Sequence, residues 1–185
     1  FINMSVSAVY KYEGMVDKIV GDGLMALFGA PVAHEDHAQR ACYASLSIQR
    51  ALAEFGDGLK NEKGIDFRMR IGLNSGNVVV GSIGDDLRMD YTAIGDATNL
   101  AARMESMAEP GHTLASINTY ALARDFFEFE SHGKVEVKGK EKLQEADRLS
   151  KAGEVETRIE ASAARGLSRF VGRGREIQTL KEGFE

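Results

Sequence analysis

The chain has 185 residues, of which 43% are apolar and 28% charged, a balance typical of a globular domain with a sizeable core. Its net charge of −5 argues against a general nucleic-acid binder, which would carry a basic stripe. A single cysteine excludes an internal disulfide framework and fits a reducing compartment. Because no apolar run is long enough to span a bilayer and no signal-peptide pattern begins at Phe1, a cytoplasmic location is expected.

The N-terminal third is predicted to contain a helix, a hairpin and a second, longer helix. Apolar residues at helical spacing occupy 1–13, and the start on a residue other than Met indicates a fragment or missing first residues. Two apolar stretches, 15–20 and 24–29, are joined by Gly-Asp-Gly, which predicts a hairpin. A long amphipathic helix is predicted over 34–55. Glycines and charges then predict a loop over 56–64.

Strands and helices alternate irregularly through the rest of the globular part, without an internal repeat. Alternating or continuous apolar residues predict strands at 67–76, 77–84, 89–95, 112–116, 126–139 and 142–149, with helices after Gly95 and over 118–124. This pattern favours a mixed α/β fold. From about residue 151 the chain becomes charged and poor in large apolar residues, as is typical of a linker.

The sequence KIVGDGLMALFG, residues 18–29, places Asp22 at the tip of the predicted hairpin. One interpretation is structural, because Asp and Gly tolerate the backbone conformations of tight turns. The other is a metal ligand, because a hairpin tip holds a carboxylate rigidly and Mg²⁺ takes one or two carboxylates plus substrate phosphates. The turn alone does not separate the two.

A second group of polar residues lies in MDYTAIGDATNLAARMES, residues 89–106. Thr92 falls on a predicted strand, and Asn99 and Arg103 fall on the helix that follows. Because Asn99 and Arg103 are four residues apart, they share one helix face. An amide and a guanidinium on one face suit a sugar and a phosphate, since arginine meets phosphate with a fork of donors. The alternative is an ordinary solvated polar face.

Other polar residues give weaker signals. His34 and His37 could ligate zinc, but no third ligand is evident, and a solvated first helical turn is the preferred interpretation. Cys42 lies on an apolar stripe and is predicted to be a small core residue. The glycines of SGNVVVGSIG do not form the fingerprint that precedes a helix in dinucleotide-binding folds.

Four motifs together resemble the class III nucleotidyl cyclase catalytic domain. KIVGDGLMALFG, RIGLNSGNVVVGSIG, MDYTAIGDATNLAARME and VEVKGK occur in the order and spacing of that family, and the similarity extends from residue 1 to about 149. The resemblance implies a ferredoxin-like βαββαβ core with an added β-arm. It also implies a head-to-tail homodimer whose active sites lie at the interface and use residues from both chains.

The resemblance assigns roles in metal and base binding to three residues. Asp22 corresponds to the second of the two metal-binding aspartates, which hold Mg²⁺ or Mn²⁺, two ions in all. Lys18 corresponds to the base-selecting lysine, because an ammonium only donates and adenine N1 accepts. Thr92 stands where many adenylyl cyclases have aspartate, and its hydroxyl could accept from the adenine amine. Threonine there resembles a subgroup that includes bicarbonate-responsive cyclases.

Three further residues correspond to positions that hold the ribose and the phosphates. Asn99 would orient the ribose, and Arg103 would stabilise the charge that develops on the α-phosphate. Lys138 would hold the β- and γ-phosphates as a point charge. Its neighbour Lys140 is interpreted as a solvated lysine at a strand end.

The sequence departs from the family pattern in two respects. The motif of the first metal aspartate, similar to FxDxxGST, is absent from this chain, so one metal carboxylate and weak or no turnover are expected of the fragment. Thr92 makes adenine selection less firm than aspartate would. RFVGRGREIQTL resembles the opening of an AAA or signal-transduction ATPase, but no phosphate loop follows it.

These observations predict an adenylate cyclase that converts ATP to 3′,5′-cyclic AMP and pyrophosphate. The predicted organisation is a catalytic domain over 1–149, a linker over 150–168 and the start of an ATPase-like region over 169–185. One alternative is a catalytically silent domain that senses nucleotide or dimerises to regulate a fused ATPase. The other is a guanylate cyclase, against which Lys18 argues because guanine presents donors at N1 and N2.

Overall fold

The computed structural model divides the chain into two compact units, Phe1–Glu154 and Val155–Glu185. The residues that the structure describes are 1–83, 90–94, 96–135, 144–155, 157–164, 166, 178–179 and 181–183.

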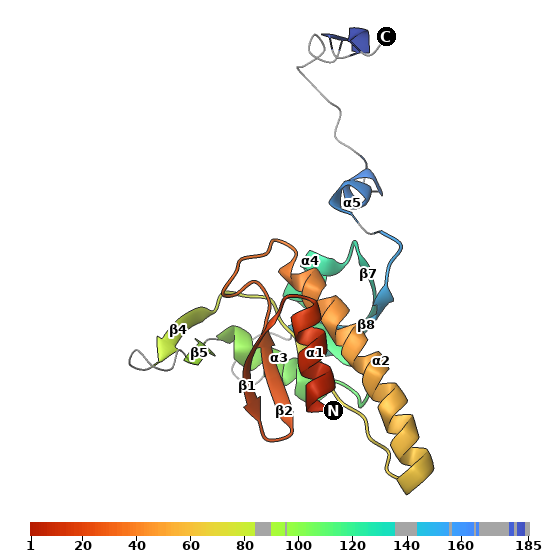
Figure 1. Ribbon diagram of the computed structural model, residues 1–185. Helices are drawn as coiled ribbons and strands as arrows, with labels where there is room; N and C mark the ends of the chain where they lie inside the picture. Colours follow the sequence, from red (N-terminus) through yellow and green to blue (C-terminus); the bar gives the residue numbers. More distant parts are fainter. Residues whose placement is uncertain are drawn as a thin grey trace. The chain divides into compact units, whose positions relative to one another are not determined.

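The first unit begins with helix α1 (Ile2–Lys11), followed by a hairpin of strands β1 (Met15–Val20) and β2 (Gly23–Leu27). The strands pair antiparallel, and the predicted helix and hairpin are confirmed. Gly14 connects α1 to β1, and a Cβ on it would come within 2.6 Å of the Phe28 ring. Glycine at this position therefore lets the hairpin fold back closely on α1 (Figure 1).

Helix α2 (His37–Lys63) is longer than the sequence predicts and includes most of the expected 56–64 loop. It ends at Gly64, whose φ of 70° is the left-handed conformation that terminates many helices. Gly56 is buried inside the helix, where a Cβ would overlap the carbonyl oxygen of Phe67. The glycine thus permits close packing and does not break the helix. Sequence patterns alone do not distinguish these two roles of a glycine.

Helices α1 and α2 lie side by side and share one apolar core with the hairpin (Figure 1). Its buried centre comprises Ala8, Val9, Ile48 and Leu52. Partly buried residues of the hairpin, of the segment before β3 and of β3 itself pack around this centre: Val16, Leu24, Ala26, Phe28, Phe67, Met69 and Ile71. The hairpin is therefore held mainly by its apolar face on the two helices.

A four-stranded sheet has the order β3-β6-β8-β7. Its strands are β3 (Ile71–Leu73), β6 (Thr113–Ser116), β7 (Phe127–Val135) and β8 (Gln144–Ala152). Strand β3 runs parallel to β6, and the other two pairings are antiparallel. The predicted mixed α/β class is confirmed, although β3 is much shorter than the expected 67–76 strand.

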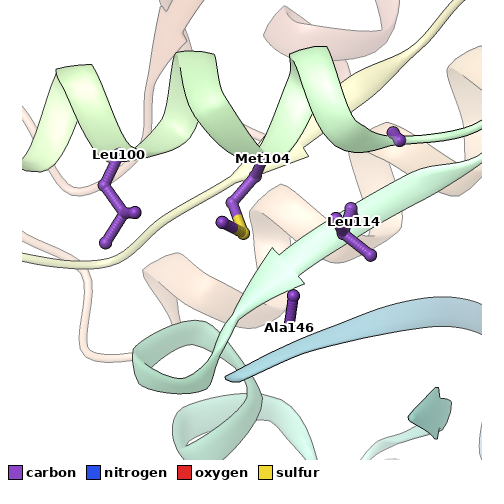
Figure 2. Close-up of a cluster of buried hydrophobic side chains, with 5 residues drawn as sticks. Leu100, Met104, Leu114 and Ala146 are labelled. Atoms are coloured by element: carbon purple, nitrogen blue, oxygen red, sulfur yellow. The ribbon is translucent and has the colours of Figure 1, made fainter. Parts of the chain in front are cut away.

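Helix α3 (Asp96–Met107) packs on this sheet through a second core. Figure 2 shows Leu100 and Met104 on the helix facing Leu114 on β6, with Ala146 on β8 nearby. The short helix α4 (Ile117–Ala123) follows β6, and the Ser116 hydroxyl caps it by accepting from the Thr119 amide. Met104 and Leu114 are almost fully buried, so α3 is anchored by about 1.5–3 kcal/mol for each such side chain.

Strands β4 (Val79–Ile83) and β5 (Asp90–Ile94) form a separate antiparallel pair. In the second unit, helix α5 (Arg158–Ala164) begins with a capping box in which Thr157 and Glu160 bond each other's backbone amides. The stretch RFVGRGRE, which resembles an ATPase opening, lies outside the described residues. Across the described parts of the chain, none of the helices has the length and apolarity needed to cross a bilayer.

Candidate active site

The loop of the β1–β2 hairpin consists of Gly21 and Asp22, between the paired residues Val20 and Gly23. Gly21 has a φ of 61°, and Glu13 is the only described non-glycine residue with a positive φ. The glycine therefore supplies the left-handed conformation, and the turn does not need an aspartate for its backbone. This finding weakens the purely structural interpretation of Asp22.

The Asp22 carboxylate stands at the exposed tip of the hairpin. It makes no hydrogen bond or ion pair with the residues that the structure describes. An exposed carboxylate with free oxygens is a ligand that suits Mg²⁺ or Mn²⁺. No group of three or more His, Cys, Asp or Glu side chains arranged to hold a metal occurs in the described ranges. Asp22 thus fits one ligand of a metal whose other ligands come from elsewhere, such as substrate phosphates.

Lys18 lies on β1, on the same hairpin as Asp22. Its side chain is 47% exposed, and its ammonium lies 3.9 Å from a carboxylate oxygen of Asp17. The neighbouring Ile19 and Val20 are 53% and 63% exposed, although both are large and apolar. The hairpin therefore presents a lysine, an acid and an apolar surface together.

Strand β5 brings the position of Thr92 to the same region. Thr92 pairs with Gly81 on β4, and β5 contacts both β1 and α3. The strand that carries Thr92 therefore contacts both the strand of Lys18 and the helix of Asn99 and Arg103. The predicted base-binding and ribose-binding elements are neighbours in one protomer.

Helix α3 presents Asn99 at its surface, and Arg103 is half-buried. Neither side chain hydrogen-bonds or forms an ion pair with another residue in the described part of the chain. On the adjoining face of α3, Leu100 and Met104 are buried in the core, which fixes the rotation of the helix. Both polar side chains are therefore without a partner among the described residues, and their contact with a ligand stays a prediction.

Asn74 positions the start of α3, a role that the sequence interpretation missed. Its side-chain amide donates to the carbonyl oxygen of Ala97 at 2.9 Å, and its side-chain oxygen accepts from the Ser116 hydroxyl at 2.6 Å. Asn74 thus ties the first turn of α3 to the end of β6. The signal was present in the LNSG motif, directly after a short strand.

Lys138, the predicted phosphate-binding lysine, lies outside the described residues. Cys42 is confirmed as a core residue, and burial raises the pKa of its thiol to about 12. His34 contacts Glu13 at 3.5 Å, and His37 bonds the His34 carbonyl oxygen. These contacts agree with a structural interpretation of the two histidines.

A cavity of about 230 Å³ lies away from the predicted site residues. It is lined by Ala108, Glu109, His112, Thr113, Leu114, Glu130, Ser131, His132 and Arg148. A hydrogen bond from Ser150 and the Arg148 guanidinium lower the pKa of the Glu130 carboxyl at its edge. Because its charged groups largely pair with each other, the cavity gives no support for a nucleotide site.

Comparisons with known proteins identify the family. Residues 7–146 match the family model described as the adenylate and guanylate cyclase catalytic domain. Adenylate cyclase 1 of Rhizobium meliloti is 33% identical over 142 residues, which is 76% of this chain and 21% of that protein. Guanylate cyclase soluble subunit beta-2 of Rattus norvegicus is 35% identical over 140 residues, which is 75% of this chain and 19% of that protein.

A solved structure gives the same result. The crystal structure of the adenylyl cyclase CyaB from P. aeruginosa superposes with a TM-score of 0.76 at 31% identity, covering 83% of this chain and 80% of that chain. This chain therefore belongs to the adenylate and guanylate cyclase catalytic domain family. It spans about a fifth of the length of the two curated relatives. Because the relatives include both cyclase types, membership of the family leaves the choice of base open.

Proposed function

We propose that this chain is the catalytic domain of an adenylate cyclase that converts ATP to 3′,5′-cyclic AMP and pyrophosphate. The observation that carries the choice of adenine is Lys18, half-exposed on β1 with its ammonium available. An ammonium donates only, so it matches adenine N1, an acceptor, and not guanine N1, which carries a hydrogen. The choice is independent of the relatives, which include both types.

In the proposed reaction, the ribose 3′-oxygen attacks the α-phosphorus, and the bond to pyrophosphate breaks as the 3′-proton is lost. Asn99 would orient the ribose through its amide. The Arg103 guanidinium would stabilise the charge that develops on the α-phosphate in the transition state. Lys138 would bind the β- and γ-phosphates, and Thr92 would accept from the adenine amine.

Two divalent ions, Mg²⁺ or Mn²⁺, would neutralise phosphate charge and lower the pKa of the 3′-hydroxyl when bound. Asp22 would hold them together with a second carboxylate. The exposed tip position of Asp22 and its lack of a partner among the described residues support this role.

We infer that the active unit is a homodimer. The apolar surface of Ile19 and Val20 beside Lys18 favours a protein contact at the hairpin, since exposed large apolar side chains commonly mark interfaces. In a two-fold dimer such a contact would bring the hairpin of one copy toward the site of the other. Asp22 and Arg103 would then act together across the interface.

The decisive experiment measures cyclic AMP formed from ATP with Mg²⁺ or Mn²⁺ by the full-length protein. Its Asp22→Ala variant should form no product, and GTP is tested as a competing substrate. Asp57→Ala is the matched control, because Asp57 is an exposed acid that pairs with Arg68 at 2.9 Å. Absence of product from a folded, dimeric wild type would support the nucleotide-sensing alternative instead.

The shared-site proposal is tested by mixing. Asp22→Ala and Arg103→Ala are each expected to be inactive alone, and a mixture that exchanges subunits should recover about a quarter of wild-type activity, because half of the dimers then hold one intact site. No recovery from a mixture shown to contain hybrid dimers would place both residues in the site of one protomer.

A further inference from the structure

Asp17 is a covered acid on β1 that none of the proposed roles uses. Its side chain is 0% exposed, whereas the side chain of the adjacent Lys18 is 47% exposed. A carboxylate oxygen of Asp17 lies 3.9 Å from the Lys18 ammonium. A carboxylate removed from water is costly unless opposite charge or hydrogen bonds compensate it, and the Lys18 ammonium supplies one opposite charge.

The contact depends on an irregularity in the hairpin. Val16 pairs with Ala26 and Lys18 pairs with Met25, so Asp17 is an extra residue with no partner position on β2. In a regular strand, neighbouring side chains point to opposite faces and do not meet. A bulge re-aims side chains, and here it brings two consecutive ones into an ion pair.

The two partners of this pair differ in freedom. Asp17 is fixed by the packing that covers it, whereas the long side chain of Lys18 ends in solvent. A lysine side chain has many rotamers, so a free ammonium seldom occupies one position. A fixed carboxylate restricts that motion, and its attraction is stronger because one partner is out of water.

We propose that Asp17 is a positioning residue that holds the Lys18 ammonium where it reads the base of the bound nucleotide. This inference rests on the proposed function, in which Lys18 selects adenine. At 3.9 Å the Lys18 ammonium is attracted to the Asp17 carboxylate by charge and not by a hydrogen bond, so its N–H donors remain for the ligand. The selectivity of the site therefore depends on a bulge and a covered acid as well as on the lysine.

The first test compares kcat/KM for ATP and for GTP in the full-length protein and its Asp17→Asn variant. Asparagine keeps the shape of aspartate and removes the charge. The preference for ATP should fall about tenfold, mainly through a higher KM for ATP, as expected for a lost binding geometry. Asp57→Asn, which removes the acid of the exposed Arg68 pair, should leave the preference unchanged.

A double-mutant cycle with Lys18→Met separates positioning from a general structural role. If Asp17 acts through the ammonium, Asp17→Asn should change the preference less than twofold once Lys18 is Met. An equal effect of Asp17→Asn in both backgrounds would overturn the proposal, as would equal losses for ATP and GTP. If Asp17→Asn fails to fold, Asp17→Glu is measured instead. Because its charge lies one methylene further out, Asp17→Glu should lower the preference for ATP. An unchanged preference would overturn the proposal.

Nucleotide binding and NMR keep this test distinct from that of the proposed function. Equal affinity of the wild type for ATP and GTP would refute base selection by Lys18, and the role of Asp17 would fall with it. If the wild type discriminates between ATP and GTP and the Asp17→Asn variant does so equally well, only the positioning role of Asp17 is refuted. Without nucleotide, the two Hε protons of Lys18 should give separate signals in the wild type and merge in Asp17→Asn; merged signals in the wild type would contradict the fixed ammonium.

Discussion

Gly72 on β3 lies directly against the backbone of Glu105 on α3. A Cβ at position 72 would overlap the Glu105 nitrogen and the Ala101 carbonyl oxygen, which are backbone atoms and cannot rotate away. The strand and the helix therefore approach as closely as two backbones can. Since α3 also carries Asn99 and Arg103, this contact sets how deeply the helix sits and where both side chains project.

Gly72→Ala should consequently impair both stability and catalysis. We expect a loss of about 1–3 kcal/mol in the free energy of unfolding, the usual cost of overpacking, together with a lower kcat. Gly58→Ala is the matched control, because Gly58 lies in helix α2 with no atom near its Cβ position, and alanine there should stabilise by up to about 1 kcal/mol. Denaturant unfolding and cyclase assays on both variants measure these effects, and a neutral Gly72→Ala would contradict the close packing of β3 on α3.

Lys18→Glu should shift the base preference. A carboxylate at position 18 would accept from guanine N1 and N2 and would leave adenine N1 facing another acceptor. We expect kcat/KM for ATP to fall at least about tenfold, and the ratio of kcat/KM for GTP to that for ATP to rise. Competition between the two nucleotides in one reaction gives the ratio directly. Undiminished ATP turnover would show that Lys18 does not read the base.

Arg103→Lys should lower kcat about 100-fold while changing the KM for ATP much less. Lysine keeps the positive charge but loses the fork of donors, so stabilisation is lost mainly in the transition state. Steady-state kinetics at saturating metal separate the two parameters. Arg50→Lys is the control on the exposed surface of α2. A rise in KM with an unchanged kcat would instead indicate that Arg103 binds the ground state.

Cys42 should make stability fall at alkaline pH. Burial raises the pKa of its thiol to about 12 in the folded state, whereas the thiol of an unfolded cysteine has its ordinary pKa of 9.0. Between these two values the folded chain retains a proton that the unfolded chain has lost, so the free energy of unfolding decreases as pH rises. The contribution is up to about 1.4 kcal/mol per pH unit.

The contribution of Cys42 is isolated by comparing the unfolding of the wild type and Cys42→Ala from pH 8 to pH 10.5. The stability difference between them should shrink steadily above pH 9. A thiol reagent at pH 8 should also leave the native protein unlabelled and react once denaturant is added. A difference that stays constant with pH would mean that the thiol titrates alike in both states.

Particular residues show why parts of this fold and site were predictable from sequence. The hairpin was predicted because Gly-Asp-Gly interrupts two apolar stretches, and both its strands and its turn were confirmed. The face shared by Asn99 and Arg103 follows from helical spacing, and the buried Leu100 and Met104 confirm which side of α3 packs inward. These features depend on neighbours in the chain.

Features that depend on distant contacts were missed. The glycine at position 56 has the local signature of a helix breaker, but its purpose is the approach of Phe67, eleven residues later. Asn74 was recognised only as part of a motif, because its partners Ala97 and Ser116 follow it by 23 and 42 residues. The bulge at Asp17 depends on the register of β1 against β2, which two apolar stretches alone do not determine.

The isolation of the β1–β2 pair has a consequence for how the molecule exchanges its amide hydrogens. Within the described ranges this pair forms a sheet of two strands, whereas β6 and β8 each have a hydrogen-bonded strand on both sides. Two-stranded sheets are marginal and rely on their packing, so the hairpin should open far more often than the larger sheet. Its amides should exchange with deuterium well before those of β6. A nucleotide bound to Lys18 and a metal bound to Asp22 would then slow amide exchange most strongly in the hairpin. Ligand binding would therefore stabilise the folded form of the hairpin that carries both residues.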